Sequence, residues 1–147
     1  MVGRTMQQSD HTVKGEGGRG RRVPLAVYAV LIAVGAYAGA LGLVSGFLRL
    51  PPDLEERLPF ASPVLGGIAL TVIVAVPATV VAVLAWLAHR GADLAAVIEG
   101  LLLIGWIVVE LAFIRELSYF HVIYVVVGLG LIAWGRDALG QWRQWRQ

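Results

Sequence analysis

Two glutamates interrupt a stretch of sequence that is otherwise apolar. Glu99 and Glu110 lie eleven residues apart within residues 92–114. In a helix this spacing is three turns plus roughly 20°, so both carboxylates share one face. They are also about 16 Å apart along the helix axis, whereas carboxylates that act on one bond stand within roughly 10 Å of each other. The two glutamates therefore cannot form a catalytic pair.

Polar residues that follow Glu110 are expected to lie beside it in space. A short connection after residue 114 predicts an antiparallel helical hairpin, in which Glu110 is level with about Ile123. His121 and Tyr124 then lie at the depth of Glu110 and can hydrogen-bond it. Arg115 is close enough in sequence to reach back toward the same carboxylate. These residues form a candidate polar or relay site.

Glu99 has its own expected partners, at the other end of the same helix. The hairpin brings it level with Trp134, whose indole N–H is a donor, and Tyr28 is expected at a similar depth. One histidine and one glutamate are too few for a metal site, which needs three or four ligands. Nothing in the sequence pairs a nucleophile with a base. We therefore predict no metal, no cofactor and no enzymatic activity.

The overall composition indicates a membrane protein. Hydrophobic residues make up 58% of the 147 residues, mean hydropathy is +0.75, and charged residues make up only 15%, against about 25% in a soluble domain. The net charge is only +2 and the arginines cluster at the ends of apolar segments, which is typical of membrane flanks and does not favour nucleic acid. The chain has no cysteine.

Four apolar stretches are each close to the roughly 20 residues that cross a bilayer as a helix. They predict an all-α integral membrane protein, a four-transmembrane-helix bundle with spans at about 23–48, 64–88, 92–114 and 119–135. Nine of the twelve Lys and Arg residues lie on one side of this arrangement and three on the other. The positive-inside rule then places both termini in the cytoplasm and the protein in the plasma membrane.

The two terminal segments have different predicted roles. Residues 1–22 are polar, glycine-rich and basic, which predicts a disordered cytoplasmic tail. Their run GEGGRG matches a dinucleotide fingerprint in letters only, because it lacks the strand that such a fingerprint follows. Residues 136–147 end in QWRQWRQ. This pattern predicts an anchor at the membrane surface, made by Trp142, Arg143, Trp145 and Arg146.

Small residues and a proline shape the predicted spans. In the first span four glycines fall on one helix face, at Gly35, Gly39, Gly42 and Gly46. Two GxxxG motifs end to end permit close helix packing, either against the other three helices or against a second copy of the chain. Pro77 lies inside the second span and predicts a kink there.

Part of the sequence resembles a known group of proteins. The run from LPFASPVLGGIAL through GLLLIGWIVVELAFIRELSYFHVIY, within residues 58–135, is similar to uncharacterised small four-helix integral membrane proteins of actinobacteria. The resemblance implies a four-span topology in a bacterial plasma membrane. It implies no activity and no functional residues.

The function predicted from the sequence is that of a small non-enzymatic integral membrane protein. It would be structural or accessory, or would bind a partner, either a further copy of itself or a larger membrane complex. In this interpretation Glu110 makes a hydrogen-bonded contact that fixes helix packing. The alternative is a small transporter or proton-coupled component that uses Glu110, His121 and Glu99, because ionisable residues inside a membrane are rare and often functional.

Overall fold

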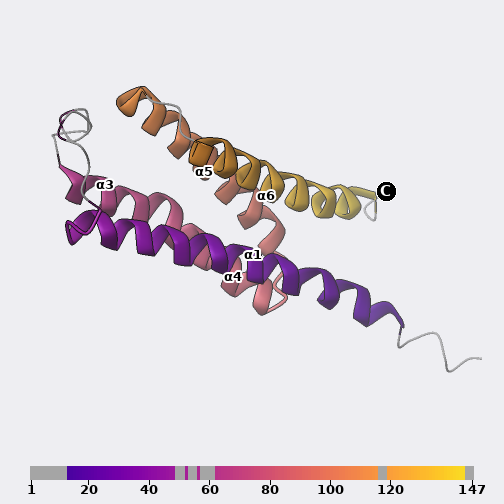
Figure 1. Ribbon diagram of the computed structural model, residues 1–147. Coiled ribbons are helices and arrows are strands. Elements are labelled where there is room, and N and C mark those ends of the chain that lie inside the picture. The colour runs from indigo at the N-terminus through magenta and orange to yellow at the C-terminus, as the bar shows by residue number, and fades with distance from the viewer. Residues whose placement is uncertain (1–12, 49–51, 53–55, 57–61, 116–118, 145–147) are drawn as a thin grey trace, which may run out of the picture.

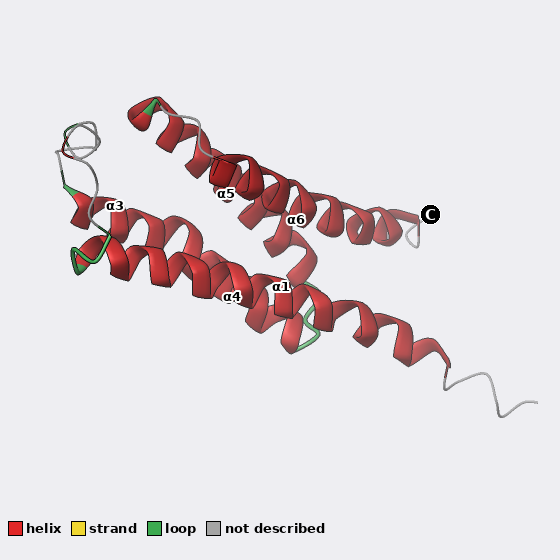
Figure 2. Cartoon of the chain, in the orientation of Figure 1, coloured by secondary structure: helices red, strands yellow, loops and turns green. Residues whose placement is uncertain are grey.

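A computed structural model of the chain describes residues 13–48, 52, 56, 62–115 and 119–144. The described part is helical and contains no strand (Figure 2), so the prediction of an all-helical chain is confirmed. The elements are α1 (Val13–Val44), α3 (Pro63–Leu70), the π-helical turn η2 (Thr71–Ala75), α4 (Val76–Trp86), α5 (Ala92–Ile114) and α6 (Tyr119–Gln144).

Three helical stretches are long and apolar enough to cross a membrane. They are Arg22–Val44, the continuous run Pro63–Trp86, and Ala92–Phe113. The apolar part of α6, His121–Arg136, is shorter and would extend about 24 Å as a helix. Fewer than half of the residues in each of the three long stretches are buried. Most of their apolar surface is therefore not covered by the chain itself.

The helices are arranged as two packed pairs (Figure 1). α1 runs beside α3, η2 and α4, and α5 packs most extensively against α6. α5 also contacts α4 and η2, which joins the two pairs. At one end Arg22 donates a hydrogen bond to the carbonyl of Ala88, in the turn between α4 and α5. At mid-length the hydroxyl of Tyr28 donates to the carbonyl of Val127 at 3.2 Å, which ties α1 to α6.

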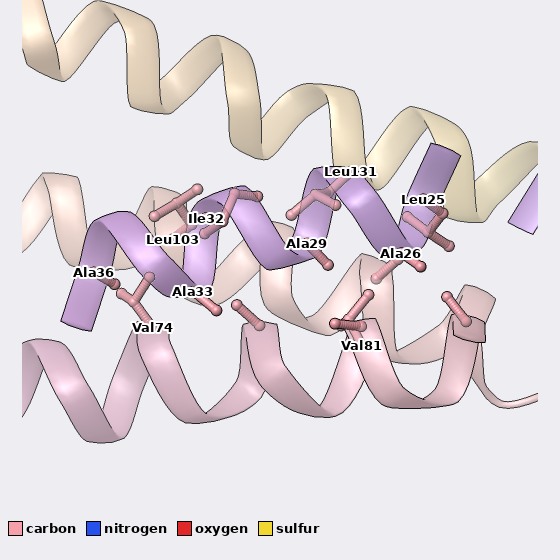
Figure 3. Close-up of a cluster of buried hydrophobic side chains, with 14 of the residues drawn as sticks. Leu25, Ala26, Ala29, Ile32, Ala33, Ala36, Val74, Val81, Leu103 and Leu131 are labelled. Carbon is pink, nitrogen blue, oxygen red and sulfur yellow. The ribbon is translucent and has the colours of Figure 1, made fainter. Parts of the chain in front are cut away.

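The buried face of α1 consists largely of alanine. Alanines three or four residues apart bring the α1 backbone close to η2 and α4, where Val74 and Val81 fill the space between the helices (Figure 3). Small side chains permit this close approach. The buried alanines of α1 are Ala26, Ala29, Ala33, Ala36 and Ala40.

The glycine face of α1 does not pack as predicted. A methyl group added at Gly35 or Gly46 would meet no atom within 4 Å. Gly46 has a φ of +70° and lies in the turn that ends α1, while Gly42 lies against Leu48 of that same turn. Of these four glycines, only Gly39 approaches another helix: a methyl group added there would lie 3.4 Å from the Leu70 side chain of α3. The intramolecular packing face is therefore the alanine face, and self-association through the glycines stays a prediction.

The ends of two helices differ from the predicted ones. α1 begins at Val13, inside the predicted disordered tail, and ends at Val44 rather than near residue 48 because the turn at Gly46 intervenes. α6 continues to Gln144, through most of the predicted C-terminal tail. Extending an existing helix adds one hydrogen bond per residue without a new nucleation step, so polar flanks join a helix that the apolar segment has started. The prediction of disorder is thus wrong for residues 13–22.

The predicted distortion at Pro77 takes the form of a π-helical turn. Val76 donates its N–H to the carbonyl of Thr71, five residues earlier. Such a turn relieves the clash between the proline ring and the preceding turn of helix. The hydroxyls of Thr71 and Thr79 each donate to the carbonyl four residues earlier, at 2.9 and 2.7 Å. Both threonines therefore satisfy carbonyls around the irregular segment.

The α5–α6 pair depends on glycine at its points of closest approach. A methyl group added at Gly100 would lie 2.6 Å from the carbonyl oxygen of Gly128, and one added at Gly128 would lie 3.0 Å from that of Gly100. Two turns away, Gly135 sits directly against the backbone of Asp93. Paired in this order, the two helices run antiparallel, as the hairpin prediction requires. No side chain would fit between the backbones at these positions.

Adding a single methyl group at Gly100 should destabilise the protein. Gly100→Ala forces the α5 and α6 backbones apart, and we expect the free energy of unfolding to fall by about 1–3 kcal/mol. The measurement is unfolding of the purified protein in detergent, followed by circular dichroism. Gly105→Ala is the matched control: it is on the same helix with no atom within 4 Å of the added methyl, so it should be neutral or stabilising. Equal effects of the two variants would contradict this account of the helix pair.

Candidate functional site

Glu110 lies one turn before the end of α5, and two side chains reach its carboxylate. The Nε2 atom of His121, in the first turn of α6, is 3.7 Å from the Oε2 atom of Glu110. The indole of Trp106, one helical turn earlier on α5, lies close to this carboxylate and lines the same pocket. The His121 side chain is 11% exposed and that of Glu110 is 31% exposed. The carboxylate is therefore partly enclosed and partly accessible.

The predicted neighbours of Glu110 are found in part. The proximity of His121 is confirmed, and Tyr124 lies on the same wall of the site, one turn further along α6. Arg115 does not reach back toward Glu110. It is an exposed residue that caps the end of α5 with a φ of +55°, and its backbone N–H donates to the carbonyl of Leu111. Within the described ranges, the ionisable side chain that lies close to Glu110 is His121.

A pocket of about 100 Å³ opens beside this carboxylate. We call it the Glu110 pocket. Five helical elements contribute to its wall: α1, α3, η2, α5 and α6. Among the described residues, this wall is apolar except at Glu110, Tyr124 and the indole N–H of Trp106. Its lining residues are Ile32, Gly35, Ala36, Gly39, Leu70, Val74, Leu103, Trp106, Ile107, Glu110 and Tyr124.

The α1 glycines that fail to pack help to form this pocket. Gly35 and Gly39 both line it, and an added methyl at Gly35 would enter open space. Trp106 also lines the pocket, and the sequence analysis missed it. Its spacing of four residues from Glu110 places the two on one helix face, and this signal was available in the sequence. The pocket itself depends on four separate segments of the chain and has no signature in any one of them.

Glu99 has no hydrogen-bond partner. Its side chain is fully buried, and neither Oε1 nor Oε2 is hydrogen-bonded. The predicted contacts with Tyr28 and Trp134 are therefore wrong. The Tyr28 hydroxyl donates instead to the carbonyl of Val127, because α1 presents that residue to the α6 backbone. Ala96 and Leu103, one turn to either side of Glu99, belong to the apolar core.

The two glutamates share a face, and the pocket covers most of the distance between them. Glu110 and Leu103 both line it, and Leu103 is only four residues, or about 6 Å along the axis, from Glu99. The glycines near the middle of the helices do not add space for water. Gly100 and Gly128 are packed against each other's backbones. About one helical turn of packed side chains therefore separates the pocket from Glu99.

The predicted surface anchor lies largely beyond the described structure. Trp142 and Arg143 belong to the helical backbone of α6, while Trp145 and Arg146 lie outside the described residues. In the part of the chain that the structure describes, no three His, Asp or Glu side chains gather where they could hold a metal ion. The anchoring role stays a prediction.

Comparisons with known proteins do not add to this description. No protein-family model, no curated protein and no solved structure matches the chain. The resemblance to small four-helix membrane proteins therefore stays a prediction.

Replacing Glu99 by an apolar residue of similar size should stabilise the protein. A buried polar group without a partner is unfavourable by about 1–3 kcal/mol, so we expect Glu99→Met to raise the free energy of unfolding by about that amount. Denaturant unfolding of the purified protein in one detergent measures the change. Glu110→Met is the control, because it removes a carboxylate that has partners, and it should not stabilise. A lower stability of Glu99→Met would show that the carboxylate makes a favourable interaction.

Proposed function

We propose that the protein is a small non-enzymatic integral membrane protein of the plasma membrane, with an accessory or partner-binding role. The exposure of large apolar side chains on every long helix carries this proposal. Leu31 is 65% exposed, Val72 62%, Leu101 58% and Val126 62%. In water such a surface would promote aggregation, whereas lipid chains cover it favourably. Helices are also the form in which a chain satisfies its backbone hydrogen bonds inside lipid.

The proposed topology has four spans, with both termini in the cytoplasm. The apolar part of α6 is shorter than the roughly 30 Å hydrocarbon core, but local thinning of the bilayer accommodates a short span at modest cost. Tyr119 and Arg136 flank it, as aromatic and basic residues flank membrane spans. The excess of Lys and Arg at the termini and in the α4–α5 turn supports a cytoplasmic location for these segments.

The accessory role is supported by the uncovered side of α6. α6 packs chiefly on α5, which leaves an apolar face at the periphery of the bundle. Val122, Val126 and Leu129 lie three or four residues apart on this face, and each is more than half exposed. A second copy of the chain or a helix of a larger membrane complex fits such a face, because helices in lipid associate by packing side chains closely.

Cysteine accessibility tests the topology directly, since the chain has no cysteine of its own. In intact bacterial cells, Phe47→Cys should react with a membrane-impermeant maleimide, because it follows α1 on the outer side. His89→Cys and Gly140→Cys should react only after the cells are permeabilised. The wild-type chain is the control for background labelling. Reaction of Gly140→Cys in intact cells would contradict the fourth span, and the opposite pattern at all three sites would reverse the topology.

A second candidate function is that of a proton-coupled component. It is favoured by one observation: Glu110 and His121 form a close ionisable pair at a pocket that extends toward the buried Glu99. A protonatable pair in a partly open pocket is the arrangement that a proton relay needs. The packed turn between Leu103 and Glu99 would then have to open during transport.

Proton flux into liposomes distinguishes this candidate from a purely accessory role. If the relay operates, proteoliposomes should dissipate an imposed pH gradient faster than empty liposomes, and Glu110→Gln should remove the difference, because glutamine keeps the shape of glutamate but cannot ionise. A fluorescent pH indicator inside the liposomes reports the rate. Gly105→Ala serves as a variant that leaves both carboxylates in place. A wild-type rate equal to that of empty liposomes would exclude the proton-coupled function.

A further inference from the structure

We propose that the Glu110 pocket binds a small organic cation, namely a primary alkylammonium group. The inference goes beyond the accessory role proposed above, because it concerns the interior of the bundle and a ligand that is not a macromolecule. Binding requires no proton flux, so it does not depend on the proton-coupled candidate either. Charge, aromatic rings and the size of the pocket each support it.

The charge of the pocket favours a cation. Among the described residues of its wall, Glu110 is the only acidic one, and none is arginine or lysine. His121 approaches one carboxylate oxygen at 3.7 Å, which is longer than a hydrogen bond, and the indole of Trp106 lies nearby. A carboxylate has about four acceptor positions, so acceptors remain for the N–H groups of an ammonium ion. The apolar wall around them lowers the local dielectric and strengthens the attraction.

Two aromatic residues line the pocket together with the carboxylate. Trp106 and Tyr124, from α5 and α6, line the same pocket as Glu110. Cations are attracted to the faces of such rings, and aromatic residues are used to recognise organic ammonium ligands. The remaining wall is aliphatic or glycine, which suits the alkyl part of the ligand. A metal ion does not fit this wall, because it would find a single carboxylate where three or more ligands are needed.

The size of the pocket sets the length of the ligand. An apolar cavity of 150 Å³ holds benzene, so a pocket of about 100 Å³ holds a group of somewhat fewer atoms. n-Butylammonium, with one nitrogen and four carbons, matches this size and places its charge at Glu110. Its neutral analogue n-butanol has the same length and can also hydrogen-bond. Comparing the two separates binding by charge from binding by apolar contact alone.

The same chemical group occurs in free amines and in the headgroups of aminolipids. Glu110 is only about 6 Å along the axis from the end of α5, so a lipid headgroup at the surface is a second source of the ammonium. Nanodiscs distinguish the sources. In discs of phosphatidylglycerol alone, free n-butylammonium is the only amine, and phosphatidylethanolamine added to the discs competes with it if the natural ligand is a lipid.

The test is nuclear magnetic resonance of the indole N–H groups in the full-length protein in phosphatidylglycerol nanodiscs. The Trp106 signal is identified by its loss in Trp106→Phe. We expect n-butylammonium to shift this signal saturably, and Glu110→Gln to weaken binding at least tenfold. Gly35→Leu should also abolish binding, because its side chain fills the pocket while Glu110 stays in place. Gly105→Leu is the control, since Gly105 has equal free space but does not line the pocket.

Three results would overturn the proposal. One is n-butanol binding as tightly as n-butylammonium, which would make the pocket an apolar cavity only. Another is unchanged binding by Glu110→Gln, which would remove the role of the carboxylate. The last is unchanged binding by folded Gly35→Leu, which would place the ligand elsewhere. Competition by phosphatidylethanolamine supports a lipid headgroup as the source of the ammonium, and its absence supports a free amine.

Discussion

Close approach of helix backbones is the constraint on which the rest of this structure depends. Between α5 and α6, Gly100 and Gly128 lie so near each other that neither can carry a side chain. In lipid, apolar side chains gain little by leaving their surroundings, so helices associate through close packing rather than through the hydrophobic effect. Because α6 packs chiefly on α5, this glycine contact fixes the register that brings His121 to Glu110.

That register explains why the two glutamates differ although they share one helix face. Near the end of the hairpin, the helices leave room for Glu110 to meet Trp106 and His121. Eleven residues earlier, close packing around Gly100 leaves Glu99 enclosed and without a hydrogen-bond partner. An apolar residue at that position would avoid the desolvation penalty. A carboxylate at a position where it disfavours folding therefore points to a role other than packing.

The sequence predicts those features that local pattern determines. Hydropathy places α5 at residues 92–114, and the short connection after it predicts the contact between Glu110 and His121. The sequence does not predict the features that depend on how the helices pack in three dimensions. The glycine motif of α1 suggested an interface. Instead, α1 packs through its adjacent alanine face, whose methyl groups fill the space between the helices. The partners predicted for Glu99 were wrong because the register of the hairpin differs. Gly135 packs against Asp93, so Trp134 lies near the start of α5 rather than beside Glu99.

The pocket follows from the way in which α1 packs and is not a packing defect. Because α1 packs through its alanines, Gly35 and Gly39 are left opposite the carboxylate face of α5. A single methyl group at Gly35 would start to fill this space without meeting any atom, so folding alone does not require glycine there. Gly35 is exposed yet lines the pocket, so it lies where the pocket opens. A glycine that keeps space open beside a carboxylate, Trp106 and Tyr124 is more consistent with a site that admits a ligand than with incomplete packing.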